Sequence, residues 1–257
     1  MYPYLFNLNK LPSYMALICV GIIAAFVCFR ILATKTKLSI EAFKFYGLCA
    51  IVAIIGGFLF ARLFQMLYNF IETGDKGTGI TFLGGLIGGV GVFFVVERIA
   101  GKKHRGELLS STNIMLPCIV LAHFFGRIGC FLGGCCYGAK TDSFFGVRFV
   151  ENISQNGEWI FGEPRIPTQL IEAIFLLLLF ITLLIFIFRF KKPNFVAIVY
   201  MYAYSVFRFL LEFLRDDPRG AFLLGLSPSQ VICILLLITA IALNVLIVKR
   251  AKKANTN

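Results

Sequence analysis

The sequence predicts an all-α integral membrane protein with seven transmembrane helices, an outside N-terminus, a cytoplasmic C-terminus and a short outer-face cap. Composition gives the first reason: 59% of the 257 residues are apolar, 15% are charged, and 24 more are glycines. Soluble domains average about 45–50% apolar residues even when glycine is counted. The second reason is that seven apolar runs are long enough to span a hydrocarbon core about 30 Å thick. We expect a single transmembrane domain over residues 1–257.

Each of the seven runs is predicted to be a helix, because only helices and closed barrels satisfy the backbone inside lipid. A barrel is disfavoured, since the alternation of apolar and polar residues that barrel strands require is absent. The predicted spans are Met15–Ala33, Tyr46–Phe70, Ile80–Val96, Ile114–Leu132, Leu170–Phe188, Phe195–Leu214 and Val231–Val248.

The distribution of basic residues predicts the orientation. One alternating set of loops and chain ends carries fifteen Lys and Arg residues, and the opposite set carries seven. Because cytoplasmic loops are enriched in Lys and Arg, the richer set is expected inside the cell. The net charge of +12 is therefore spread mainly over cytoplasmic helix ends. A nucleic-acid partner is excluded on this ground, because it would need the basic residues clustered on one soluble face.

The longest stretch without a span is about 137–168, on the predicted outer side. Its Phe144, Phe145, Val147 and Trp159 suit a short strand or a cap that lies on the membrane surface.

Three arginines interrupt the apolar runs: Arg62, Arg127 and Arg208. A cationic side chain at the centre of a membrane helix costs about 2.5–3.5 kcal/mol on insertion scales, so such residues are functional candidates by default. The alternative for each is a pair with an acid, or a side chain that reaches to the interface.

The sixth run carries a polar stripe. Tyr204, Arg208 and Glu212 follow one another at intervals of four, and Arg215 comes three residues later. This spacing places them along one helix face. An Arg208–Glu212 pair within the helix is expected, but neutralisation alone does not explain the other two polar residues on that line.

The fourth run carries a second stripe. His123 and Arg127 are four residues apart, and Cys130 lies about one turn further on. Gly126 and Gly129 would let another backbone or a lipid headgroup approach closely. A single histidine in a helix is more often a satisfied core residue than a base, so the residues alone leave both interpretations open.

The third run contains Gly84 and Gly85 within a longer glycine-rich segment. Such segments in membrane helices more often serve packing than ligand binding. Arginine, however, is suited to bidentate capture of phosphate, and a phospholipid headgroup is the obvious anion at membrane depth. The residues thus indicate a membrane protein that handles a phosphate-bearing lipid, without fixing the reaction.

Cys130, Cys135 and Cys136 form a C-x4-C-C pattern near the predicted outer face. Its spacing is not that of a zinc site, and we predict no metal here. The three thiols are left as packing residues, a disulfide or a nucleophile.

Several segments, in this order, resemble motifs of the prolipoprotein diacylglyceryl transferases, which are bacterial membrane enzymes with seven helices. The strongest are Gly126–Phe131, similar to the family's Gly-Arg-x-Gly-Asn-Phe, and Tyr204–Glu212, similar to Tyr-x-x-Phe-Arg-x-x-x-Glu. Leu83–Gly88 resembles His-Gly-Gly-Leu-Ile-Gly, and Pro167–Leu170 with Glu172 resembles Pro-Ser-Gln-Leu-Tyr-Glu. Weaker matches are Tyr14 near the start of the first helix, and Arg62 with Tyr68 in the second.

The resemblance implies a multi-pass enzyme of the bacterial cell membrane and a reaction that needs no cofactor. Phosphatidylglycerol would give its diacylglyceryl group to a cysteine thiol in a prolipoprotein signal peptide, with release of glycerol phosphate. The expected catalytic residues are Arg127, Arg208, Glu212 and His123. The expected substrate-binding residues are Tyr14, Arg62, Gly84, Gly85, Gly126, Gly129, Cys130, Tyr204 and Arg215.

Two positions depart from the family pattern. Leu83 stands where the family has a histidine, and Cys130 where it has an asparagine. If that histidine is the general base, this chain lacks it, and we hypothesise that His123 takes its place.

Two other functions stay open at this point. One is a divergent paralogue that uses phosphatidylglycerol with a different acceptor. The other is a non-enzymatic lipid-binding protein, which ranks last because the inverted repeats and broken helices of transporters are absent.

Overall fold

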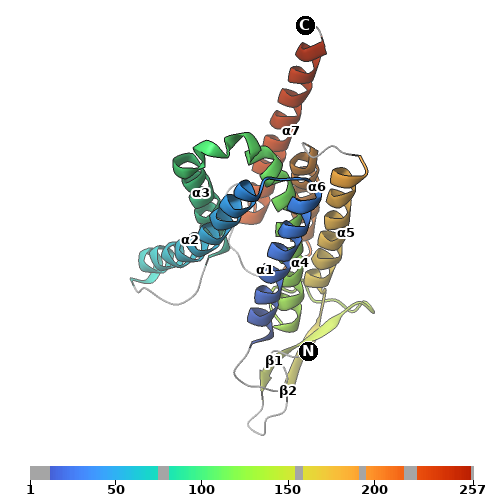
Figure 1. The fold of residues 1–257 in the computed structure, drawn as a ribbon. Helices are drawn as coiled ribbons and strands as arrows, with labels where there is room; N and C mark the ends of the chain where they lie inside the picture. The colour runs from blue at the N-terminus through green and yellow to red at the C-terminus, as the bar shows by residue number, and fades with distance from the viewer. Residues whose placement is uncertain (1–11, 75–80, 154–158, 191–194, 217–224, 256–257) are drawn as a thin grey trace. The chain divides into compact units, whose positions relative to one another are not determined.

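A computed structural model describes residues 12–74, 81–153, 159–190, 195–216 and 225–255. The described residues are mostly helical, at 78%, and each predicted run corresponds to one helix (Figure 1). The helices are α1 (Ser13–Lys35), α2 (Ile40–Thr73), α3 (Phe82–Ala100), α4 (Leu108–Leu132), α5 (Thr168–Phe188), α6 (Val196–Glu212) and α7 (Pro228–Asn255).

The predicted fold class is confirmed, because six helices in the described part of the chain are long and apolar enough to cross a membrane. They are α1, α2, α3, α4, α5 and α7. The seventh, α6, has 17 residues, which is near the lower limit of about 17–25 residues for a span. Its crossing of the membrane stays a prediction, as does the orientation of the chain.

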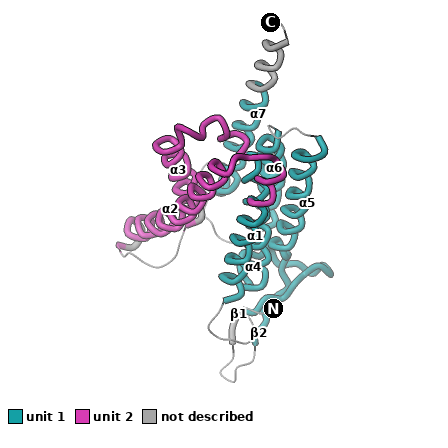
Figure 2. Tube along the Cα trace, in the orientation of Figure 1, with its two compact units in different colours: residues 1–29, 113–257 teal, residues 30–112 magenta. Residues whose placement is uncertain are grey.

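The helices belong to two compact units (Figure 2). Unit 1 contains residues 1–29 and 113–257, and unit 2 contains residues 30–112. The expectation of one transmembrane domain over 1–257 stays a prediction, and we describe each unit by itself.

Unit 2 is built on close contact between α2 and α3. A Cβ atom on Gly57 would lie 3.1 Å from the Gly85 carbonyl oxygen, and one on Gly85 would lie 3.2 Å from the Ala61 Cβ. Small residues let helix backbones approach in this way where lipid gives no hydrophobic drive. Helix α2 begins at a cap formed by Ser39, whose Oγ accepts a hydrogen bond from the Ala42 amide.

Unit 1 packs α1 against α4 and α5 against α6. A Cβ on Gly129 would lie 3.3 Å from the Tyr14 carbonyl oxygen, so α1 and α4 approach closely at this point. The rings of Phe175 and Phe207 are stacked with centroids 3.8 Å apart, which joins α5 to α6.

The stretch 137–168 contains an antiparallel hairpin of β1 (Val147–Ile153) and β2 (Trp159–Arg165). The sequence-based expectation of a short strand here is therefore confirmed. The hairpin follows α4 and precedes α5 (Figure 1). Phe149 is buried, and its ring contacts those of Phe131 and Tyr137. The hairpin is thus attached to the C-terminal end of α4 by aromatic packing.

Candidate functional site

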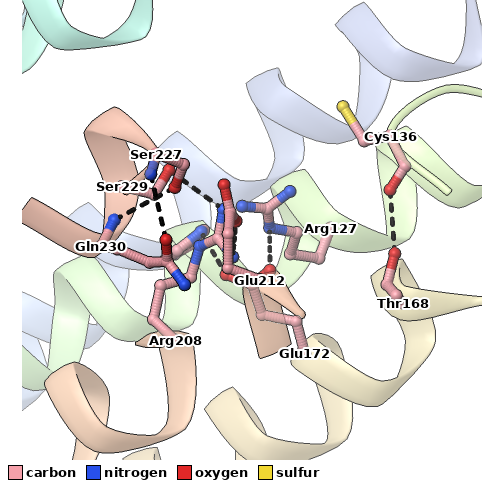
Figure 3. Close-up of polar contacts among 10 residues, drawn as sticks. Arg127, Cys136, Thr168, Glu172, Arg208, Glu212, Ser227, Ser229 and Gln230 are labelled. Atoms are coloured by element: carbon pink, nitrogen blue, oxygen red, sulfur yellow. Dashed lines mark hydrogen bonds and ion pairs between the residues drawn. The ribbon is translucent and has the colours of Figure 1, made fainter. Parts of the chain in front are cut away.

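A buried glutamate contacts both His123 and Arg127, the two basic side chains of the α4 stripe. Glu172, in the second turn of α5, is fully buried, and its Oε2 lies 3.0 Å from Arg127 Nε. Its Oε1 lies 3.6 Å from His123 Nε2. The expectation that His123 and Arg127 share one helix face is confirmed, because one carboxylate contacts both. This glutamate fixes the orientation of the guanidinium of Arg127 (Figure 3).

The predicted pair on α6 is also present. Arg208 Nη1 lies 2.6 Å from Glu212 Oε2, and both side chains are almost fully buried. Arg208 Nη2 also donates a hydrogen bond of 3.3 Å to Ser229 Oγ on α7 (Figure 3). Two contacts from two helices therefore hold this guanidinium group in place.

The start of α7 explains why Ser229 lies where it does. Ser227 Oγ accepts a hydrogen bond from the Gln230 amide, and Gln230 Oε1 accepts one from the Ser227 amide. This reciprocal pair is a capping box, with Pro228 in the first helical position, where proline is favoured. The local sequence therefore fixes the helix start next to Arg208.

Tyr204, the first residue of the α6 stripe, contacts His123 of the α4 stripe. Its ring is 5.8 Å from that of His123, in an edge-on arrangement, and it stacks on Tyr200 one turn earlier at 5.6 Å. The stripes predicted on α4 and α6 therefore face a common region within unit 1.

The two glycines predicted in α4 differ in their surroundings. A Cβ on Gly126 would meet nothing within 4 Å, whereas one on Gly129 would meet the backbone of Tyr14. Gly126 thus has open space beside Arg127. The space beside Gly129 is occupied by α1. This contact places Tyr14, which is partly exposed, next to α4.

Three predicted substrate-binding residues lie in unit 2. Arg62 is on α2, and Gly84 and Gly85 are on α3. Both glycines pack on α2: a Cβ on Gly84 would overlap the side chain of Phe64, and Gly85 contacts Ala61. Each thus has a packing role within its unit, and the substrate roles of all three residues stay predictions.

The predicted residues Cys130 and Arg215 belong to a cluster at the C-terminal end of α4. The Sγ atoms of Cys130, Cys135 and Cys136 lie within 4.8 Å of one another. Hydrogen bonds with the other two thiols, together with the adjacent Arg215 guanidinium, lower the pKa of the Cys136 thiol. The backbone next to Arg215 is tied to this turn, because the Ala139 amide donates to the Leu214 carbonyl at 2.9 Å.

Sequence reasoning missed Glu172 as a site residue, although its motif was noted. The partner of Arg127 lies 45 positions away on another helix, so no local spacing rule connects them. A signal was nevertheless available, because Glu172 is an acid at the start of an apolar span. An ionisable residue inside a span is a site candidate whatever its sign.

The charges of the site do not cancel. Arg127, Arg208 and Arg215 contribute three positive charges, and Glu172 and Glu212 contribute two negative ones, which leaves one positive charge. Each guanidinium group carries five N–H donors, and the contact of Arg127 with Glu172 is made at Nε. The arrangement therefore suits a monoanion with several acceptor oxygens, such as a phosphodiester.

Comparison with known proteins agrees with this chemistry. The family model for prolipoprotein diacylglyceryl transferase matches residues 3–246. The chain is 34% identical to phosphatidylglycerol–prolipoprotein diacylglyceryl transferase 2 of Clostridium perfringens, over 91% of this chain and 90% of that protein. It is 35% identical to the corresponding enzyme of Clostridium tetani, over 94% and 96%.

A relative from Dehalococcoides mccartyi with the same enzyme name is 30% identical, over 81% of this chain and 79% of that protein. The family-model match over residues 3–246 includes α1 to α6 and most of α7. From the extent of the family match and the identity to these relatives, the chain belongs to the prolipoprotein diacylglyceryl transferase family.

Proposed function

We propose that this protein transfers the diacylglyceryl group of phosphatidylglycerol to the cysteine thiol of a prolipoprotein signal peptide. The sulfur attacks the glycerol carbon that carries the phosphate, a carbon–sulfur bond forms, and the carbon–oxygen bond to phosphate breaks. The products are a thioether-linked lipid and glycerol phosphate. The thiol loses its proton in the same reaction, so the site needs a proton acceptor and a group that stabilises the leaving phosphate.

The observation that carries the proposal is the pair of helix arginines, the half-buried Arg127 and the buried Arg208, each held by its own glutamate. Glu172 holds Arg127 and Glu212 holds Arg208, within helices whose other residues are mainly apolar. Preorganised donors in a site that excludes water stabilise developing charge without further reorganisation. In our proposal, Arg127 and Arg208 bind the phosphate and stabilise the second negative charge that grows on it as the bond breaks.

The two glutamates are positioning residues in this proposal. A carboxylate at Arg127 Nε orients the terminal nitrogens of that guanidinium group, and Glu212 and Ser229 together do the same for Arg208. Gly126 leaves open space beside Arg127 into which a headgroup fits. Tyr204, whose ring contacts His123, supplies a hydroxyl group from the α6 stripe.

His123 is our candidate for the proton acceptor. Its Nε2 faces Glu172 at 3.6 Å, which leaves Nδ1 as the nitrogen that would accept the thiol proton. A neutral imidazole is the natural base near neutral pH. The role matters here because Leu83 stands at the position of the family's histidine.

The test is mass spectrometry of products after the purified protein is mixed with phosphatidylglycerol and a lipobox peptide. We expect a peptide heavier by one diacylglyceryl group, and one glycerol phosphate for each modified peptide. A His123→Ala variant should lose transfer, while His123→Gln, which keeps the size of the side chain, should lose it equally. Wild-type rates in both histidine variants would refute the base assignment but leave the transfer itself intact.

Complementation distinguishes the proposal from a divergent paralogue. Growth of a strain that lacks its own diacylglyceryl transferase, with lipidated lipoprotein detected, supports the proposed acceptor. Failure to complement, with phosphatidylglycerol-dependent labelling of another molecule, would favour a different acceptor, for which the Leu83 substitution is the motivating observation. Phosphatidylglycerol binding without any product would favour a lipid-binding protein.

A further inference from the structure

The three thiols at the end of α4 have no part in the proposed transfer. Cys130 is buried in the last turn of α4, Cys136 is half-buried, and Cys135 is exposed in the turn that follows. Their Sγ atoms all lie within 4.8 Å of one another. Such convergence requires explanation, because two of the three residues are adjacent in sequence and adjacent side chains ordinarily diverge.

The backbone of the turn produces the convergence. Gly134 has φ of +68° and Cys136 has φ of +64°, and the Cys135 amide donates a hydrogen bond to the Cys130 carbonyl at 3.1 Å. A left-handed conformation is ordinary for glycine but costs free energy for a residue with a Cβ. Cys136 therefore holds an unfavourable conformation that brings its thiol back toward Cys130.

Two side chains from α5 hold the turn in this shape. Gln169 Nε2 donates a hydrogen bond to the Cys135 carbonyl at 2.7 Å. Thr168 Oγ1 donates one to the Cys136 carbonyl at 3.0 Å (Figure 3). Both side chains are fully buried. Strain that is fixed by buried partners is typical of binding sites, and here it is used to bring three sulfur atoms together.

We propose that Cys130, Cys135 and Cys136 form a three-thiolate binding site for a divalent metal ion of the zinc class. Thiolates at about 2.3 Å from a tetrahedral zinc ion lie roughly 3.8 Å from one another. Sulfur atoms already within 4.8 Å reach that spacing by small side-chain rotations. The exposed side of Cys135 leaves the fourth position open to water.

The charge of the surroundings favours a divalent ion over a monovalent one. Three thiolates with a divalent ion carry one net negative charge, and the Arg215 guanidinium lies beside the Cys136 thiol to balance it. A monovalent ion would leave two negative charges against that arginine. Soft thiolate ligands also disfavour magnesium and calcium, which prefer oxygen.

The sequence pattern did not indicate this site, because C-x4-C-C differs from the usual zinc spacings. Those spacings describe loops in which each ligand has ordinary backbone angles. Here Cys135 and Cys136 are adjacent, and the positive φ of Cys136 turns the backbone so that both thiols face Cys130. The three thiols take no step in the proposed transfer, although Arg215 borders both sites. The tests below measure metal binding and not transfer, so they decide this proposal separately.

The first test measures metal content. Protein purified in detergent from cells grown with added Zn²⁺ should retain about one zinc per chain. A Cys135→Ser variant, whose side chain is exposed, should fold normally and lose most of that zinc, and Cys135→Ser/Cys136→Ser should lose all of it. Cys19→Ser, an exposed cysteine on α1, is the matched control and should keep the wild-type content.

The second test uses Cd²⁺ as a spectroscopic probe. Titration of the metal-free protein should give the ultraviolet charge-transfer band of cadmium thiolates, saturating at about one equivalent, and the band should be absent from Cys135→Ser/Cys136→Ser. Alkylation followed by mass spectrometry should show these three thiols protected by metal and released by a chelator. Equal zinc in the wild type and Cys135→Ser, no cadmium band, or a disulfide between two of the three cysteines would each overturn the proposal.

Discussion

Both compact units use glycine contacts between helices, but unit 1 adds charged pairs between helices. In unit 2, α2 and α3 meet through Gly57, Gly85 and Gly89, where backbone touches backbone. In unit 1, the helices are linked by buried charges, from Arg127 to Glu172 and from Arg208 to Ser229. Glycine contacts allow close helix packing but bring no ionisable group to the interface. A guanidinium group in an apolar setting raises the free energy of the fold unless it is paired with an acid. The comparison supports our placement of the phosphate chemistry in unit 1, and it gives the glycine-rich segment of unit 2 a packing role within that unit.

The largest effect is expected from removing the charge of Glu172. Glu172→Gln keeps the size of the side chain but leaves Arg127 buried without its carboxylate, which costs about 3–5 kcal/mol for a broken buried pair. We expect a large fall in unfolding temperature in detergent together with loss of transfer. Glu163→Gln, at an exposed position in the hairpin, is the control. Wild-type stability of Glu172→Gln would show that the pair does not hold unit 1 together.

The next largest effect is expected for Arg208→Lys in unit 1, which should lower transfer activity without lowering the unfolding temperature. Arg208→Lys keeps the positive charge but loses the planar group that contacts Glu212 and Ser229 at once. We expect transfer to fall by about 10²- to 10³-fold, as for loss of one preorganised donor, with little change in unfolding temperature. Arg148→Lys, on the exposed face of β1, should be fully active. An equally active Arg208→Lys would remove Arg208 from the phosphate site.

A smaller effect is expected in unit 2. Gly84→Ala places a methyl group against the Phe64 side chain and close to the Phe60 carbonyl oxygen, and overpacking of this kind costs about 1–3 kcal/mol. Gly91→Ala, where a Cβ would meet nothing within 4 Å, should be neutral. If Gly84→Ala instead unfolds normally but raises KM for phosphatidylglycerol, the glycine contacts substrate, as the sequence motif predicts.

The smallest effect concerns the hairpin. Lys140 contacts Glu163 and lowers the pKa of that carboxyl group. A carboxyl group with a lowered pKa stabilises the fold above its ordinary pKa, and the contribution disappears as the pH falls through the lowered value. Because both side chains are more than half exposed, Glu163→Gln should leave the unfolding temperature at neutral pH unchanged. A clear drop would mean that the hairpin is fixed by this pair.

Local patterns predicted the parts of the fold that depend on local physics. The length and hydropathy of the runs located all seven helices, and spacing by four placed Arg208 beside Glu212. The Arg127–Glu172 pair escaped prediction because it joins two helices through tertiary packing. The convergence of the three thiols escaped it too, because it depends on a left-handed cysteine that no spacing rule anticipates.

The difference between the two ion pairs has a consequence for how the protein enters the membrane. Arg208 and Glu212 lie on the same helix, so their charges neutralise each other as soon as α6 forms. Arg127 and Glu172 lie on α4 and α5, so each helix carries an uncompensated charge until the two meet. The translocation machinery therefore encounters α6 as a nearly neutral segment, whereas α4 and α5 gain from being inserted together. The order of synthesis suits this, because α5 is the next helix made after α4.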